Sequence, residues 1–202
     1  MARARSLFDA DLLPEAFRIQ EDFLLPAEEA DLVARFQRLE FQEMRMRGVA
    51  ARRRILQYGW RYTFESASLS EGEPLPDFLL PIRDRAAVFA GTPSSTLSEA
   101  LLTEYPPGAP IGWHRDAPPF GDVVGISLLA PCRFRFRRGR TGAWETTEVQ
   151  LMPRSIYLLT GPARTEWEHS IPAVTELRYS ITFRTLRKGR TAAGSHKPDP
   201  PQ

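Results

Sequence analysis

The stretch Arg178-Tyr179-Ser180-Ile181-Thr182-Phe183-Arg184 alternates polar and apolar side chains over its whole length. Because successive side chains of a β-strand point to opposite faces, this pattern predicts a strand with one apolar face and one polar face. The polar face carries an arginine at each end. Burying two guanidinium groups without anions is costly, so this face either binds anions or lies exposed to water.

Similar short runs, separated by Pro and Gly, make up the rest of the chain from residue 100 onward. Such a series is typical of an all-β sandwich or barrel. The candidate strands are residues 100–105, 110–116, 123–130, 132–138, 147–151, 155–160, 166–170 and 177–186. Eight short strands suit a double-sheet jelly roll, which we expect to span residues 100–187.

Two helices are expected before this region. Pro26 is followed by acidic residues, which is typical of a helix start, and Leu32 and Phe36 continue at helical spacing. A second helix is expected from about Asp77 to Phe89. The predicted fold class is therefore α+β, with N-terminal supporting helices and a jelly-roll core in one domain, residues 1–187. Residues 188–202 have little to bury and are expected to be disordered.

Two histidines and an aspartate form a candidate metal site. His114 and Asp116 are two residues apart in a run predicted to be extended, so both side chains project to the same side. His169 is the remaining histidine outside the tail. Two histidines and one carboxylate can hold one face of an octahedral Fe(II) ion and leave the opposite positions open. Taken alone, His114 and Asp116 could instead be polar side chains on a surface strand, and His169 could be a histidine of the core.

A small dicarboxylate beside this metal would also explain the arginines of the first stretch. Each of Arg178 and Arg184 could make a forked, charge-assisted pair with one carboxylate. The two observations together therefore favour a buried, anion-binding face over an exposed one.

Composition bounds the class of protein. The chain has 202 residues, of which 42% are hydrophobic, and this is enough for one domain with a sizeable core. The formal net charge is only +2, so no overall field identifies a partner. The single cysteine, Cys132, suits a reducing compartment and is expected to be a buried small hydrophobe. Without an apolar stretch of signal-peptide or membrane-spanning length, we expect a soluble, cytoplasmic protein that does not associate with membranes. We also expect it to be a monomer.

The stretch from Leu102 to Arg184 resembles the AlkB family of Fe(II)/2-oxoglutarate-dependent dioxygenases, because it matches their His-x-Asp, distal His and Arg-x5-Arg pattern in order and separation. The resemblance implies a double-stranded β-helix core, with Fe(II), 2-oxoglutarate and O2 as cofactors and co-substrate. It also implies a nucleotide-recognition lid within residues 20–90. The implied iron ligands are His114, Asp116 and His169.

The same resemblance implies the residues that bind 2-oxoglutarate. Tyr105 and Arg178 would hold its distal carboxylate, and Arg184 would pair with the carboxylate beside the keto group. Thr103 and Ser180 stand where family members often have Asn, and both keep a hydrogen-bonding oxygen. The loop after Asp116 differs more, because it reads Ala117-Pro118-Pro119-Phe120 where DNA-repair members commonly place acids.

Basic and aromatic residues suggest how a substrate would bind. Arg133, Arg135 and Arg137 alternate with phenylalanines, so they should form a cationic row on one face of a strand. Arg52, Arg53 and Arg54 form a second cluster. The expected substrate contacts, suited to phosphates and an unpaired base, are Tyr58, Trp60, Tyr62, Arg53 and Arg135. Alternatively, these arginines only make an outer strand face soluble, and the aromatic residues belong to the core.

These features predict an Fe(II)/2-oxoglutarate-dependent dioxygenase that oxidatively demethylates N-alkylated bases in DNA or RNA. One alternative is a hydroxylase or demethylase of protein or tRNA, which would use the same site under a different lid. A second alternative is a catalytically inactive nucleic-acid-binding module on the same fold.

Overall fold

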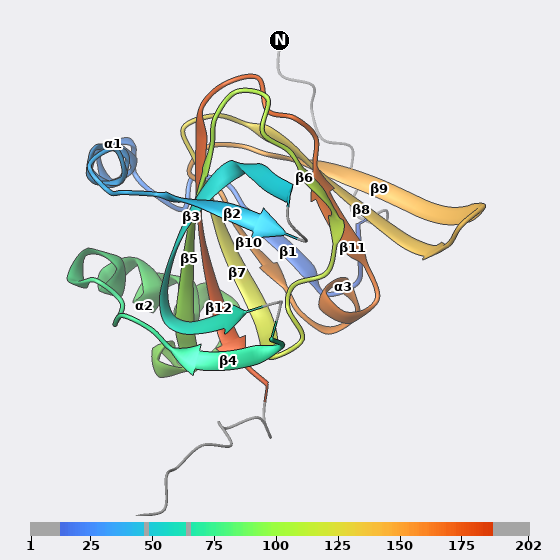
Figure 1. Ribbon diagram of the computed structural model, residues 1–202, viewed down its shortest axis with the longest axis horizontal. Helices are drawn as coiled ribbons and strands as arrows, with labels where there is room; N and C mark the ends of the chain where they lie inside the picture. The colour runs from blue at the N-terminus through green and yellow to red at the C-terminus, as the bar shows by residue number, and fades with distance from the viewer. Residues whose placement is uncertain (1–12, 47–48, 64–65, 188–202) are drawn as a thin grey trace, which may run out of the picture.

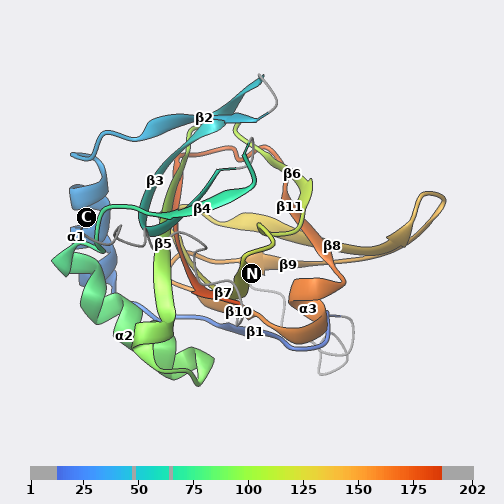
Figure 2. The same cartoon turned by 60° about the horizontal axis from the view of Figure 1, so that its bottom comes forward.

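A computed structural model describes residues 13–46, 49–63 and 66–187, and two antiparallel sheets face each other in it (Figures 1 and 2). The predicted disordered tail, residues 188–202, lies outside the described residues. No helix in the described part of the chain has the length and apolar character that crossing a bilayer requires.

The larger sheet combines jelly-roll strands with strands from the N-terminal part of the chain. Its strands, in spatial order, are β1 (Phe17–Gln20), β10 (Ile156–Leu159), β7 (Phe120–Leu128), β12 (Arg178–Leu186), β5 (Leu97–Tyr105), β3 (Val49–Thr63) and β2 (Gln42–Met46), and β4 (Ser68–Glu71) pairs with β3. The smaller sheet runs in the order β6 (Ile111–His114), β11 (Glu168–Ile171), β8 (Cys132–Arg140) and β9 (Ala143–Leu151).

The predicted jelly roll is confirmed, because each of the eight candidate strands corresponds to one of β5 to β12. The main difference in bounds is β9, which begins at Ala143 and not near residue 147. Arg140 pairs with Ala143, so Thr141 and Gly142 form a tight turn, and Gly142 has the positive φ of 86° that such a turn favours. The resulting β8–β9 hairpin projects from the body of the molecule (Figure 1).

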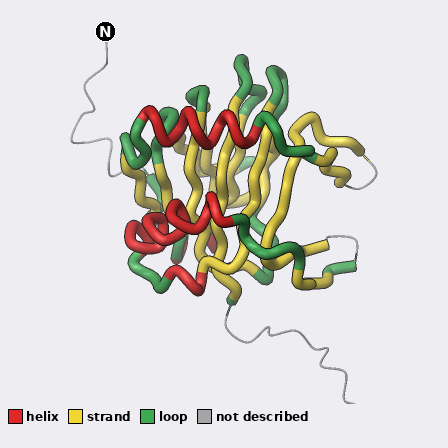
Figure 3. The backbone as a smooth tube through the Cα atoms, turned by 90° about the vertical axis from the view of Figure 1, so that its left-hand side faces the viewer, coloured by secondary structure: helices red, strands yellow, loops and turns green. Residues whose placement is uncertain are grey.

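Both expected helices are present and lie across the outer face of the larger sheet (Figure 3). Helix α1 spans Pro26–Phe36, and its Glu28 side chain accepts a hydrogen bond from the Leu25 backbone N–H. Helix α2 spans Leu80–Ala90 and follows a 3-10 turn at Asp77–Leu79. Leu32 and Phe36 of α1 and Ile82 and Ala86 of α2 are buried in one core with the sheet. A short helix, α3 (Gly161–Thr165), precedes β11.

The strands β1 to β4 are not in the sequence prediction, which expected only helices and a lid between residues 20 and 90. Strand β3 is long because it serves three partners: residues 49–55 pair with β2, residues 54–59 pair with β5, and, after a change of partner, Trp60–Thr63 pair with β4. The change occurs at Gly59, whose φ is 74°. A Cβ atom there would lie 2.0 Å from the Ser98 carbonyl oxygen, so the close approach requires glycine.

The alternation along β12 separates two interiors, as the sequence predicts. Tyr179, Ile181 and Phe183 point into the core beneath the helices. Arg178, Ser180, Thr182 and Arg184 line a cavity between the two sheets. A second apolar cluster, which includes Phe134, Phe136 and Tyr157, fills the rest of the space between the sheets. Cys132 is buried in this cluster, as expected.

Candidate metal and cofactor site

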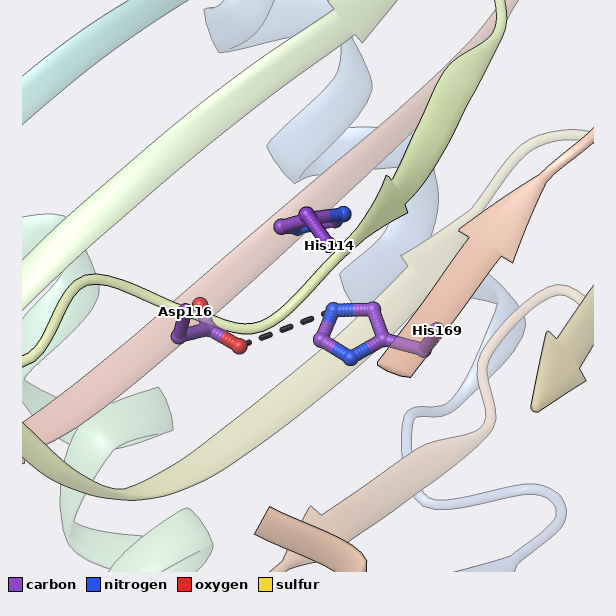
Figure 4. A group of neighbouring side chains, drawn as sticks. All are labelled: His114, Asp116 and His169. Atoms are coloured by element: carbon purple, nitrogen blue, oxygen red, sulfur yellow. Dashed lines mark ion pairs between the residues drawn. The ribbon is translucent and has the colours of Figure 1, made fainter. Parts of the chain in front are cut away.

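The structure brings His114, Asp116 and His169 together at one end of the cavity (Figure 4). His114 ends β6 and His169 lies directly opposite it on β11, because the two residues pair in register. Asp116 follows in the loop after β6, and its Oδ2 lies 3.5 Å from His169 Nε2. One candidate ligand atom from each residue lies within 4.8 Å of the other two. The three groups can therefore converge on one ion.

Hydrogen bonds orient two of these side chains. His114 Nδ1 lies 2.9 Å from the Gly112 carbonyl oxygen, which can only accept, so Nδ1 carries the proton and Nε2 keeps its lone pair. Asp116 Oδ1 accepts from Arg184 Nε at 2.9 Å and Nη2 at 2.7 Å. Asp116 Oδ2 is buried and has no hydrogen-bond partner among the described residues. A buried carboxylate oxygen that faces an imidazole nitrogen and accepts no hydrogen bond from the described residues fits the role of a metal ligand.

Burial and charge set the protonation states that a metal needs. Burial, followed by the neighbouring His114, lowers the pKa of His169 to about 3. Burial also lowers the pKa of His114. For Asp116 burial works in the opposite direction, but Arg184 and the two imidazoles outweigh it and lower the pKa of the carboxyl. At neutral pH the site offers two neutral imidazoles and one carboxylate, and this donor set fits Fe(II).

Arg178 is a buried cation without an anion. Its side chain is 1% exposed, and Nε and Nη2 donate to Ser127 Oγ at 3.3 and 3.1 Å. The guanidinium lies 4.7 Å from the centre of the Tyr105 ring. Its Nη1 has no hydrogen-bond partner among the described residues. No carboxylate among the described residues pairs with this guanidinium, so a ligand carboxylate would complete the site.

Arg184 differs, because two acids already surround it. Besides Asp116, Arg184 Nη1 donates to both oxygens of Glu99 at 2.9 and 3.0 Å. Glu99 is fully buried, and burial raises its pKa to about 7 although Arg184 opposes that rise. The expected pairing of Arg184 with the keto-side carboxylate stays a prediction, since its donors face protein carboxylates here.

The cavity has a volume of about 300 Å³, and residues of β3 form part of its wall. Thr103 and Ser180 lie opposite each other on β5 and β12, and both line it together with Tyr105. Of the residues expected to contact substrate, Arg53 and Tyr62 line the cavity.

The other three predicted substrate residues lie elsewhere. Tyr58 packs against the core beneath the helices, and Trp60 pairs with Glu71 in the β3–β4 ribbon. Arg135 lies over Trp113 and donates to Ser170 Oγ. It belongs to the outward face of β8, because Phe134 and Phe136 on either side of it are buried.

Acidic residues neutralise much of the predicted cationic row on β8. Arg133 pairs with Glu148 at 2.6 Å, and Arg137 pairs with Glu168 at 2.6 Å. Arg138 pairs with Glu145 and with Glu166. The guanidinium of Arg137 also stacks on Trp113 and Trp144, at 4.6 and 4.2 Å from their ring centres. This face is therefore a network of paired charges rather than a row of open cations.

Two buried charged residues beside the site, Glu99 and Arg164, were not found from the sequence. Glu99 lies an even number of residues before Thr103 and Tyr105 on β5, so its place on the cavity side of the strand follows from alternation. Arg164 of α3 is buried and donates to the carbonyl oxygens of the loop after Asp116, namely those of Asp116, Ala117, Phe120 and Gly121. No sequence pattern indicates that role.

Comparisons with known proteins agree with this geometry. The family model of the 2OG-Fe(II) oxygenase superfamily matches residues 17–187. The "Alkylated DNA repair protein ALKBH8 homolog" of Arabidopsis thaliana is 31% identical over 210 residues, which cover 91% of this chain and 59% of that protein. The "DNA oxidative demethylase ALKBH2" of Bos taurus is 31% identical over 142 residues, which cover 63% of this chain and 50% of that protein. The chain thus spans about half to three fifths of the length of these curated relatives.

A solved structure shares the fold. The structure of OsALKBH1 superposes with a TM-score of 0.67 at 15% sequence identity, and the match covers 86% of this chain and 98% of that one. The two-sheet core is therefore the double-stranded β-helix that the resemblance implied. The chain therefore belongs to the 2OG-Fe(II) oxygenase superfamily, and the group formed by His114, Asp116 and His169 fits the Fe(II) site of such an oxygenase.

Proposed function

We propose that this protein oxidises alkyl groups on the nitrogen atoms of nucleic-acid bases. The observation that carries the proposal is one cavity that holds both an orphaned Asp116 oxygen beside two neutral histidines and a buried Arg178 without an anion. His114, Asp116 and His169 would hold the iron. When bound, iron, 2-oxoglutarate and O2 supply the oxidation of a C–H bond, coupled to conversion of 2-oxoglutarate into succinate and CO2.

The protein's own residues position the co-substrate. Arg178 would pair with the distal carboxylate of 2-oxoglutarate, because its Nη1 is unpaired and Ser127 fixes the opposite edge of the guanidinium. Tyr105, Thr103 and Ser180 would donate from the cavity wall. Arg184 remains a candidate for the keto-side carboxylate.

The cavity walls would exclude water from the reacting carbon. Phe120 and Phe134 line the cavity and are 2% and 1% exposed. Arg164 fixes the loop that carries Ala117 and Phe120 by donating to its carbonyl oxygens. Apolar side chains beside an oxidising centre limit side reactions with water.

The relatives' names and the cavity rim support the choice of substrate. The names describe DNA repair and DNA oxidative demethylation. Arg53, Arg61 and Tyr62 line the cavity where β3 passes it, so they offer cations for a phosphate and a ring for a base. Trp60 and Arg135 lie outside the cavity lining and would contact only flanking parts of a long substrate, whereas Tyr58 packs against the core beneath the helices. Hydroxylation of an N-methyl group gives a hemiaminal that releases formaldehyde and leaves the unmodified amine. We place the protein in the cytoplasm as a monomer.

The test is release of formaldehyde and succinate from N-methylated single-stranded DNA and RNA, with Fe(II) and 2-oxoglutarate. An Asp116→Ala variant serves as the control. Formaldehyde that appears with wild type and not with the variant supports the proposal. Succinate without formaldehyde from either nucleic acid would redirect the search to methylated peptides or intact tRNA. If wild type binds oligonucleotides but yields neither product when its iron content is verified, the protein is only a binding module.

A further inference from the structure

Glu99 is a buried acid that stands behind the metal centre. It is 0% exposed, and it lies directly opposite Arg184 in the β5–β12 register and opposite Gly59 in the β3–β5 register. The residues that line the cavity come from positions around it, such as Gln57 and Leu101, but the lining does not include Glu99. Its carboxylate therefore acts on its neighbours and not on a ligand in the cavity.

The guanidinium of Arg184 connects Glu99 to Asp116. Nη1 donates to both Glu99 oxygens at 2.9 and 3.0 Å, and Nε and Nη2 donate to Asp116 Oδ1 at 2.9 and 2.7 Å. Because a guanidinium is planar and its N–H groups form a fixed fork, holding one edge sets the orientation of the other edge. Glu99 thus determines how Arg184 meets Asp116.

This arrangement controls which oxygen of Asp116 is available. Two donors occupy Oδ1, whereas Oδ2 has no hydrogen-bond partner within residues 13–46, 49–63 and 66–187 and lies 3.5 Å from His169 Nε2. Rotation of the carboxylate would break both bonds to Arg184. Asp116 is therefore held so that it presents a single oxygen toward the imidazoles.

The net charge of Glu99, Arg184 and Asp116 also favours metal binding at Asp116. One arginine between two carboxylates has a net charge of −1 when both acids are ionised, and a divalent cation is drawn to that charge. Without Glu99 the remaining Arg184–Asp116 pair is neutral.

We propose that Glu99 is a positioning residue of the metal centre, which holds Arg184 against Asp116 so that Asp116 gives one oxygen to the metal from a net negative group. The inference rests on the proposed function in one respect, namely that Asp116 binds the metal. It assigns Arg184 a bracing role in addition to any contact with the co-substrate.

The experiment measures Co(II) binding to the metal-free protein, without 2-oxoglutarate or substrate, at about pH 8, where Glu99 is ionised. Glu99→Gln is expected to weaken Co(II) binding by roughly 10- to 100-fold, the usual effect of removing an outer-shell partner. The visible absorption of bound Co(II) should also change, because Asp116 is free to rotate. Neither readout depends on turnover.

Glu104→Gln is the matched control. Glu104 lies on the same strand and is 7% exposed, but it pairs with Arg54 and accepts from Tyr179 Oη on the opposite face of the sheet. Its loss should leave the Co(II) affinity within about twofold of wild type, since it is not connected to Arg184. An equal loss in both variants would mean that any buried acid of β5 matters, and the inference would be wrong.

The remaining outcomes are distinguishable. If Glu99→Gln binds Co(II) as tightly as wild type and gives the same spectrum, the inference alone is overturned. If wild type binds Co(II) no better than a His169→Ala variant, the proposed function is overturned together with the inference. Should Glu99→Gln not fold, the double variant Glu99→Gln/Arg184→Gln removes both charges and keeps a hydrogen-bonded pair. That variant is expected to fold and to bind Co(II) more weakly than wild type, and wild-type affinity in it would overturn the inference.

Discussion

Replacing Arg178 by methionine should weaken binding of 2-oxoglutarate without destabilising the protein. The arginine is buried, stacks on Tyr105 and has no carboxylate partner in the part of the chain that the structure describes, so no described acid compensates its charge. Methionine fills a similar volume and removes that charge, so the melting temperature should stay equal or rise. Losing one partner of a buried, hydrogen-bonded charge pair costs about 2–5 kcal/mol, which corresponds to roughly a 30- to 4,000-fold weaker Kd.

Calorimetric titration of the Mn(II)-loaded protein would measure this effect without turnover. A second ligand, 2-oxobutanoate, keeps the keto acid and lacks the distal carboxylate, so it should bind wild type and Arg178→Met alike. Arg133→Met is a suitable control, because Arg133 pairs with Glu148 on an exposed strand face. The reasoning is refuted if 2-oxoglutarate binds Arg178→Met as tightly as wild type, or if both ligands lose affinity equally.

Three further predictions concern the metal ligands and the loop that follows them. Asp116→Ala should abolish Co(II) binding in a spectroscopic titration, because the one unpaired ligand oxygen is removed, and retained binding would exclude Asp116 as a ligand. Arg164→Met leaves buried carbonyl oxygens of the 116–121 loop without donors, so urea unfolding should show a loss of about 3 kcal/mol, and an unchanged midpoint would contradict the role assigned to Arg164. The metal-free protein should lose stability on acidification from about pH 6.5 towards pH 3, by up to about 1.4 kcal/mol per unit, because His169 binds its proton more readily in the unfolded chain. His169→Gln should flatten that dependence in urea titrations at several pH values, and an unaltered slope would assign it to other groups.

The jelly roll was predictable because each of its strands carries its own signal. Alternation along residues 178–184 places four polar side chains in the cavity and three apolar ones in the core. Strand β3 was not predicted, since its run from Arg52 to Thr63 mixes cavity-lining, core-facing and exposed positions around a bend at Gly59. A strand that changes partners midway has no single period for a pattern to reveal.

The candidate site also has one part that the sequence predicts and one part that depends on how the strands pair. The His-x-Asp spacing and the distal histidine indicated which side chains would meet, whereas the partners of Arg184 depend on strand register. Glu99 is 85 residues away from it in sequence, and only the β5–β12 pairing brings the two together. The outward face of β8 was predicted correctly, but the glutamates that neutralise it come from β9, from β11 and from the end of α3, and no local pattern reports those neighbours.

The ribbon of β3 and β4 beyond Gly59 also bears on how this fold can diversify. Residues 60–63 pair only with β4, yet Arg61, Tyr62 and Thr63 line the cavity. The described strands that carry the candidate metal ligands and the arginines proposed to bind 2-oxoglutarate are β6, β11 and β12, and they make no pairing with that ribbon. Mutations there can therefore reshape what enters the cavity while the oxidative chemistry is inherited unchanged. Substrate preference among related chains should vary fastest in this short segment.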